Sequence, residues 1–186
     1  MRRRTFDAIT TIVGFVMTAV LIVAGVLLMW GFSYSNNTVH NQLQAQQIYF
    51  PPKGSPALAP AQIGPYLNQY AGQLMTTGAQ AEAYANHFIA VHLQEIGAGK
   101  TYSQLSTQLM SVENSGKTDA KLASQVQTVF QGTTLRGLLL NAYGWWQIGQ
   151  IALIAGICSF VFAGLMLVLS VLGLLHWRKS EQAAEI

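Results

Sequence analysis

Charge is the scarcest property of this 186-residue chain, because only 9% of its residues are charged and 51% are hydrophobic. Soluble domains carry about 25% charged residues, so this deficit indicates a membrane protein. Basic residues cluster only at the two ends of the chain, although the isoelectric point is near 9.1. A DNA- or RNA-binding face needs clustered Lys and Arg, so no nucleic-acid partner is expected.

Cysteine is also nearly absent, since Cys158 is the one cysteine in the chain. This excludes an internal disulfide. An exported domain in this chain must therefore be stabilised by its own core and by its attachment to the membrane.

Two long apolar runs, residues 8–32 and 145–176, contain no Asp, Glu, Lys or Arg. At about 1.5 Å per residue, each can cross a hydrocarbon layer of roughly 30 Å. The first run exceeds the apolar region of about 7–15 residues in a cleaved signal peptide, so it predicts an uncleaved signal anchor. Proton and ion paths usually place an ionisable residue inside a span, so its absence argues against such a path.

The ends of both runs predict the topology. Arg2, Arg3 and Arg4 precede the first run, and Arg178 and Lys179 follow the second. Because cytoplasmic flanks are rich in Lys and Arg, both termini are expected in the cytoplasm and residues 33–144 outside the plasma membrane. The expected interface anchors are Trp30, Tyr34, Trp145, Trp146, Trp177 and Arg178.

The predicted fold is an all-α membrane protein, in which two antiparallel transmembrane helices carry a small extracytoplasmic helical domain. All five prolines fall between Pro51 and Pro65, which predicts a loop there. The expected segments are a cytoplasmic basic head (1–7), transmembrane helix 1 (8–32), a polar stalk (33–50), the Pro-rich loop (51–65), the helical domain (61–131), the extracytoplasmic start of a long helix (132–144), transmembrane helix 2 (145–176) and a cytoplasmic tail (177–186).

Apolar residues recur at helical spacing within the expected extracytoplasmic domain. They predict short helices over residues 62–75, 80–96 and 120–130, and a further helix that begins at Thr101. The glycines of residues 97–99 are expected to end one helix, and Thr101 is expected to cap the next. No strand alternation persists, so no sheet is expected.

Small residues recur in steps of three and four along both apolar runs. Such a seam allows close backbone approach, which is how helices pair in lipid. Its members are Gly14, Thr18 and Gly25 in the first run, and Gly149, Ala152, Gly156, Ser159, Ala163, Ser170 and Gly173 in the second. The spacing is compatible with pairing inside one chain and with pairing between chains.

His87, His92 and Glu95 are the only weak candidates for a metal site. Ligands on one helical face need a spacing of three or four residues, and only His92 and Glu95 meet it. His92 also lies in the apolar stripe of its helix, which favours a packing role. We therefore expect no catalytic residue, no metal and no cofactor.

Three stretches carry a resemblance: residues 1–7 (MRRRTFD), 48–58 (IYFPPKGSPAL) and 81–89 (AEAYANHFI). They resemble a family of small actinobacterial two-span membrane proteins, and the resemblance covers nearly the whole chain. Some members are labelled as a small subunit of an aromatic-ring-opening dioxygenase. That activity needs an iron site, typically two His and a carboxylate, and the residues of this sequence supply no such set. The resemblance implies an actinobacterial plasma membrane.

The features together favour a non-catalytic accessory or scaffold subunit of a cell-envelope membrane complex. Its expected partners are the lipid bilayer and either another membrane protein or a second copy of the chain. An alternative is a module that binds a lipid or another hydrophobic molecule at the outer leaflet, with its entrance lined by Tyr49, Phe50, Tyr66 and Tyr70. A metal-dependent enzyme using His87, His92 and Glu95 is the third hypothesis.

Overall fold

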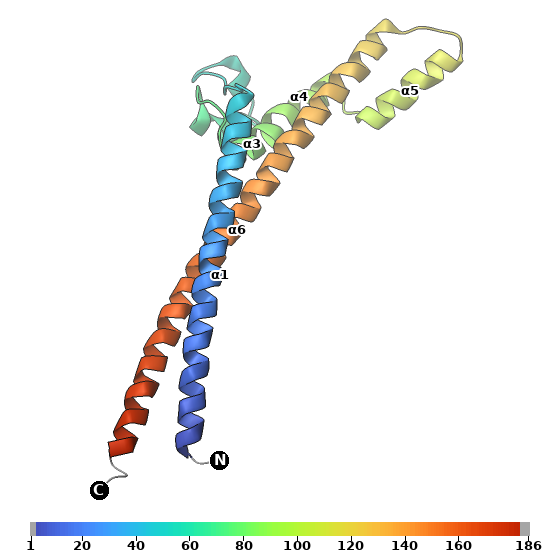
Figure 1. The fold of residues 1–186 in the computed structure, drawn as a ribbon. Helices are drawn as coiled ribbons and strands as arrows, with labels where there is room; N and C mark the ends of the chain where they lie inside the picture. Colours follow the sequence, from blue (N-terminus) through green and yellow to red (C-terminus); the bar gives the residue numbers. More distant parts are fainter. Residues whose placement is uncertain (1–2, 183–186) are drawn as a thin grey trace. The chain divides into compact units, whose positions relative to one another are not determined.

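The computed structural model describes residues 3–182, with side chains from residue 7 to residue 178. The side chains of the predicted basic head, Arg2 to Arg4, and of Lys179 therefore lie outside the described residues. The regular structure of the described part is helical (Figure 1). Its elements are α1 (Arg3–Ala45), η1 (Pro56–Leu58), α2 (Gly64–Leu67), η2 (Asn68–Tyr70), α3 (Gly78–Tyr84), η3 (Ala85–Ile89), α4 (Ala90–Ile96), α5 (Tyr102–Asn114) and α6 (Ala120–Gln182).

The chain divides into two compact units. Unit 1 joins the residues up to Tyr34 with those from Ile148 onward, and unit 2 is Ser35–Gln147. Helices α1 and α6 contribute residues to both units. Both helices are long and apolar enough to cross a membrane. The prediction of an all-helical chain with two such helices is confirmed.

Helix α6 begins earlier than the sequence indicated. Asp119 caps it, because its side chain accepts a hydrogen bond from the Leu122 N–H at 2.9 Å. The predicted interruption at Gly132 is wrong, since α6 runs unbroken from Ala120. A Cβ at Gly132 would lie 2.5 Å from the Leu93 side chain, so this glycine gives room to a neighbouring side chain rather than ending a helix.

The predicted helix over residues 62–75 is also wrong in its second half. Only α2 and η2 are helical there, and Gly72 then adopts a φ of +74°. That conformation suits glycine and turns the chain back. Leu74 next pairs with Tyr49 in an isolated antiparallel bridge, flanked by a hydrogen bond from the Met75 N–H to the Ile48 carbonyl at 2.8 Å.

Residues 78–96 form one continuous helical segment that contains a π turn at η3. Thr77 and Thr101 open α3 and α5 as capping boxes with Gln80 and Gln104. The expected cap at Thr101 is thus confirmed. Gly97 ends α4. Ala98 and Gly99, both with a positive φ, then separate α4 from α5.

The main core of unit 2 draws on almost every element of that unit. Phe50, Ile63, Leu67 and Met75 are at most 2% exposed. Val39 of α1 and Leu139 of α6 belong to the same cluster, as do buried alanines of α3. A smaller cluster joins α5 to the start of α6 through Leu105, Leu122 and Val129. These cores hold the ends of α1 and α6 that lie in unit 2.

Candidate functional site

The contact between α1 and α6 inside unit 1 is the most extensive feature that the sequence singled out. A Cβ built at Gly14 would collide with the Ser170 side chain. A Cβ at Gly25 would lie 2.8 Å from the Phe160 ring, and one at Gly173 would lie 2.9 Å from the Thr11 hydroxyl. Three glycines thus face side chains of the other helix at distances that a larger residue could not keep.

The contact pairs have a regular order along the two helices. Thr11 lies by Gly173, Gly14 by Ser170, and Met29 by Gly156. Residue numbers therefore rise along α1 as they fall along α6. Thr11 and Gly14 are three residues apart, as are Gly173 and Ser170, and this spacing occurs in a heptad seam.

The other predicted seam residues are also covered. Thr18, Gly149, Ser159, Ala163 and Ser170 are buried, and Ala152 is half-buried. The contacts of Gly14, Gly25, Gly156 and Gly173 lie within one chain, which was one of the two pairings that the sequence left open.

A hydrogen bond connects the two helices of unit 1. The Ser159 hydroxyl donates to the Leu21 carbonyl at 2.7 Å. By contrast, Thr18 donates to Gly14 and Ser170 donates to Met166, each within its own helix. Unit 2 contains a comparable bridge, in which the Ser35 hydroxyl donates to the Trp145 carbonyl at 2.6 Å.

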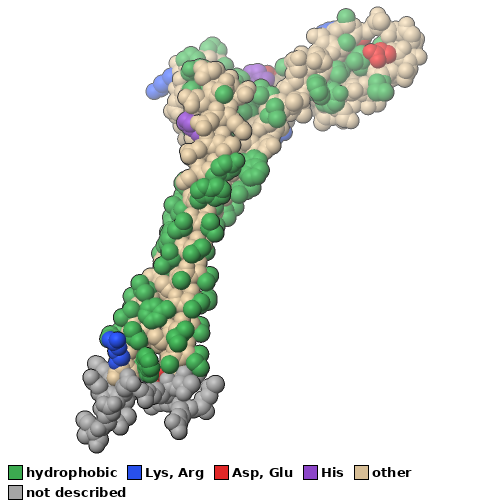
Figure 2. Space-filling model, viewed as in Figure 1, with side chains coloured by type: hydrophobic (Ala, Val, Ile, Leu, Met, Phe, Trp, Pro, Cys, Tyr) green, Lys and Arg blue, Asp and Glu red, His purple; other side chains and the backbone are tan. Residues whose placement is uncertain are grey.

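Hydrophobic side chains are spread along the visible face of the unit 1 helices (Figure 2). The side chains that face outward are large and aliphatic or aromatic, and many are more than half exposed. Examples are Ile12, Val16, Val23 and Leu27 on α1, and Ile154, Val161, Phe162, Leu165 and Leu169 on α6. A contiguous apolar surface of this kind marks a lipid or protein contact.

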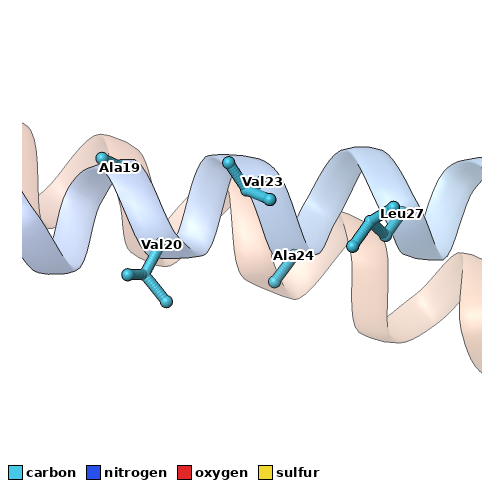
Figure 3. A pocket seen from close by; sticks show the side chains of 5 residues that line it. All are labelled: Ala19, Val20, Val23, Ala24 and Leu27. Carbon is cyan, nitrogen blue, oxygen red and sulfur yellow. The ribbon is translucent and has the colours of Figure 1, made fainter.

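A shallow, largely open groove of about 390 Å³ lies on the surface of α1 (Figure 3). Five aliphatic side chains line it: Ala19, Val20, Val23, Ala24 and Leu27. The two alanines create the depression between larger neighbours. Sequence inspection missed it, because two alanines in an apolar run carry no signal of their own.

The predicted interface anchors differ in their surroundings. Trp30 is 66% exposed and stacks on Tyr34 with ring centroids 5.7 Å apart. Trp145 and Arg178 are exposed as well. Trp146 instead packs on Gly78, where a Cβ would collide with its side chain, and Trp177 is half-buried. Only some of the six predicted interface anchors are therefore exposed.

Two of the metal candidates, His87 and His92, contact partners of their own. His87 stacks on Tyr66 with ring centroids 3.4 Å apart, whereas the His92 ring shares a 2.8 Å hydrogen bond with the Phe88 carbonyl. Within the described residues, no three His, Cys, Asp or Glu side chains group so that they could hold a metal ion. The π turn, which contains His87, also changes the angle that an α-helix would give to His87 and His92.

The entrance expected for a hydrophobic ligand is not formed by the predicted residues. Phe50 is only 2% exposed, and it packs against Tyr70 and Tyr84 in the core of unit 2. Burial raises the pKa of the Tyr84 hydroxyl. Tyr49 and Tyr66 are exposed, so two of the four predicted residues remain at the surface.

A polar chain that the sequence did not reveal links α6 to α3 and the π turn. Arg136 donates to the Asn86 side chain at 2.8 Å, and Asn86 donates to Glu82 at 2.8 Å. The second contact spans four residues and could have been found from spacing alone. The first spans fifty residues, and only the folded chain brings Arg136 to Asn86.

No protein-family model, curated protein or solved structure matches the chain.

Proposed function

We propose that this chain is a non-catalytic integral protein of the plasma membrane, which serves as an accessory or scaffold subunit of a cell-envelope complex. The observation that supports this proposal is the arrangement of side chains in unit 1. Small residues lie between the helices, while large apolar side chains face outward. Lipid tails are as apolar as these outward-facing side chains and can surround them. In lipid, helices usually pair by close approach through small residues.

The proposed topology has two antiparallel transmembrane helices, both termini in the cytoplasm and residues 33–144 outside. The order of the contact pairs in unit 1 supports opposite helix directions. Basic residues at both chain ends support a cytoplasmic location for them. The resemblance to small actinobacterial two-span membrane proteins forms part of this proposal.

Exposed apolar side chains in unit 2 support docking of a partner. Tyr102 and Phe130 lie side by side with ring centroids 5.3 Å apart, and both are exposed. Met110, also on α5, is 59% exposed. Aromatic residues and methionine are enriched where proteins bind one another.

Cysteine accessibility tests the topology in intact cells. With Cys158→Ser as background, Ser55→Cys should react with a membrane-impermeant maleimide from outside. Ser180→Cys should react only after the cells are opened. The proposed topology is wrong if Ser180→Cys is labelled in intact cells or if Ser55→Cys is protected from the reagent.

Purification from native membranes in mild detergent tests the accessory role. We expect a different membrane or envelope protein to co-purify in a fixed ratio. Met110→Glu together with Phe130→Glu should reduce its recovery, while Tyr49→Glu, at an exposed site away from α5, should not. A chain that elutes alone, or only with copies of itself, contradicts the accessory role.

A second function, binding of a lipid or another hydrophobic molecule, is favoured by the groove on α1. Its five lining residues are all aliphatic, so it suits an acyl chain. Ala24→Phe should fill the groove and lower the amount of lipid that mass spectrometry detects with the purified protein. Val16→Phe adds the same ring outside the groove and serves as the control. Equal lipid content in the two variants contradicts this function.

A further inference from the structure

Arg136 is the only Asp, Glu, Lys or Arg of the chain between Lys121 and Arg178. It comes seven residues after Val129 and three residues before Leu139, both of which are buried, so it lies on the face of α6 that packs into unit 2. Its own side chain is half-buried. Charged side chains at core-facing positions are normally paired with an opposite charge.

The structure holds the Arg136 guanidinium in place without neutralising it. Nη2 donates a hydrogen bond to the Asn86 side chain at 2.8 Å, and Asn86 donates to Glu82 at 2.8 Å. Asn86 is neutral, and it stands between the guanidinium and the Glu82 carboxylate. Among the described residues, no carboxylate forms an ion pair with Arg136. Its positive charge therefore has no direct partner there.

The nitrogen atoms of Arg136 differ in their accessibility. Nε is buried and has no hydrogen-bond partner in the described part of the chain. Nη1 also has no partner there, but it is not buried, so its two N–H groups are free to donate. A carboxylate matches a guanidinium in both charge and geometry. Because Asn86 already orients the side chain, binding a carboxylate costs little further rotamer entropy.

A lipid headgroup is a poor match for this position. Arg136 lies nine residues before Trp145, which is about 14 Å along α6. The headgroup layer is only about 5–8 Å thick on each side of the hydrocarbon core. Side chains of an α-helix also tilt toward its N-terminus, which takes the guanidinium further from the proposed span. The carboxylate should therefore come from outside the bilayer.

We propose that Arg136 receives an Asp or Glu side chain of the partner protein, an inference that rests on the proposed accessory role. A single guanidinium holds a free anion weakly, because an ion pair that stays open to water contributes little. The same pair contributes more when a docked protein excludes water from it. A partner with an unpaired carboxylate at this position is therefore favoured over one without it.

Carbodiimide cross-linking in native membranes tests the contact. The reagent takes up the water that is lost when a lysine amine and a neighbouring carboxylate form an amide. Arg136→Lys keeps the charge and supplies that amine, so it should give an adduct with the partner that the unsubstituted chain does not give. Asn141→Lys, at an exposed position about 140° away around α6, is the control and should give no new adduct.

Recovery of the partner in mild detergent provides a second test. Arg136→Gln removes the charge and keeps a donor for Asn86, and it should lower recovery about tenfold or more, as expected for an enclosed charge pair. Glu82→Gln is the control. It keeps an oxygen that accepts from Asn86 and removes a negative charge near the site, so it should not lower recovery. If Arg136→Gln fails to fold, cross-linking of the charge-retaining Arg136→Lys variant decides.

The outcomes separate this inference from the accessory role. Full recovery with Arg136→Gln overturns the contact at Arg136 and leaves the accessory role standing. The same holds if Arg136→Lys gives no more adduct than Asn141→Lys, or if its amine couples only to Glu82 of the same chain or to a lipid. If the unsubstituted chain brings down no other protein, the accessory role fails and this inference fails with it.

Discussion

The helix pair of unit 1 and the core of unit 2 bury opposite kinds of side chain. Unit 1 buries Thr11, Thr18, Ser159 and Ser170, and it exposes most of its large apolar residues. Unit 2 buries large apolar side chains, such as Phe50, and presents mainly polar residues on α5. Water drives apolar side chains together, but lipid does not. This difference between the buried side chains supports contact of unit 1 with lipid and of unit 2 with water.

Glycine shows the same contrast in detail. In unit 1, glycines face side chains of the paired helix, as Gly14 faces Ser170. In unit 2, Gly78 and Gly132 make room for the large side chains of Trp146 and Leu93. The first kind allows two helices to approach, and the second completes an apolar core. Substitutions in the two units should consequently act through different mechanisms.

The largest effect is expected from a cavity in unit 2. Leu67 is fully buried, and Leu67→Ala should lower the free energy of unfolding of this unit by about 2–5 kcal/mol. Hydrogen exchange of residues 61–96 in the detergent-solubilised protein measures the change. Ile96→Ala, at a 41% exposed position, is the control and should have a much smaller effect. Similar losses for both variants would mean that this core does not stabilise unit 2.

Overpacking the seam should have the next largest effect. Gly156→Leu places a large side chain where even a Cβ would lie 3.2 Å from the Met29 sulfur, so we expect the free energy of unfolding to fall by about 1–3 kcal/mol. Thermal unfolding in detergent measures it. Leu153→Ile, a change of shape at nearly constant volume, should cost less. If the two variants behave alike, the seam does not pair these helices.

A smaller effect is expected from the hydrogen bond that crosses between the helices. Ser159→Ala removes the donor to the Leu21 carbonyl and should weaken pairing by about 0.6 kcal/mol. Ser170→Ala removes a bond that lies within α6 and is the matched control. The same unfolding assay compares them, and an equal response would show that the crossing bond adds nothing.

The smallest effect concerns pH and unit 2 alone. Burial raises the pKa of Tyr84 above its ordinary value of about 10, so the unfolded chain releases this proton first. The stability contributed by the neutral hydroxyl is complete below pH about 10 and is lost as pH rises through the pKa of the folded state. Tyr84→Phe should flatten the decline measured at alkaline pH, and an unchanged slope would contradict this assignment.

Local sequence signals predicted the helices and several of their ends. Thr101 with Gln104, and Gly97 with Gly99, act through neighbours within five residues, so spacing alone revealed them. The same logic was wrong at residues 71–75 and at Gly132. There, pairing with residues 48–50 and contact with Leu93 decide the conformation, and both involve residues far away in sequence.

By itself, the sequence determined the helical class, the two apolar runs and the small residues that recur along them, because periodicity and composition are properties of local chain geometry. Only the tertiary structure decided which residues those small positions face. It placed Gly14 against Ser170 and Gly156 against Met29, and it left the opposite face of α6 uncovered. A seam of small residues shows that another helix can pack closely against this one. Which residues fill that position depends on the tertiary fold of the whole chain.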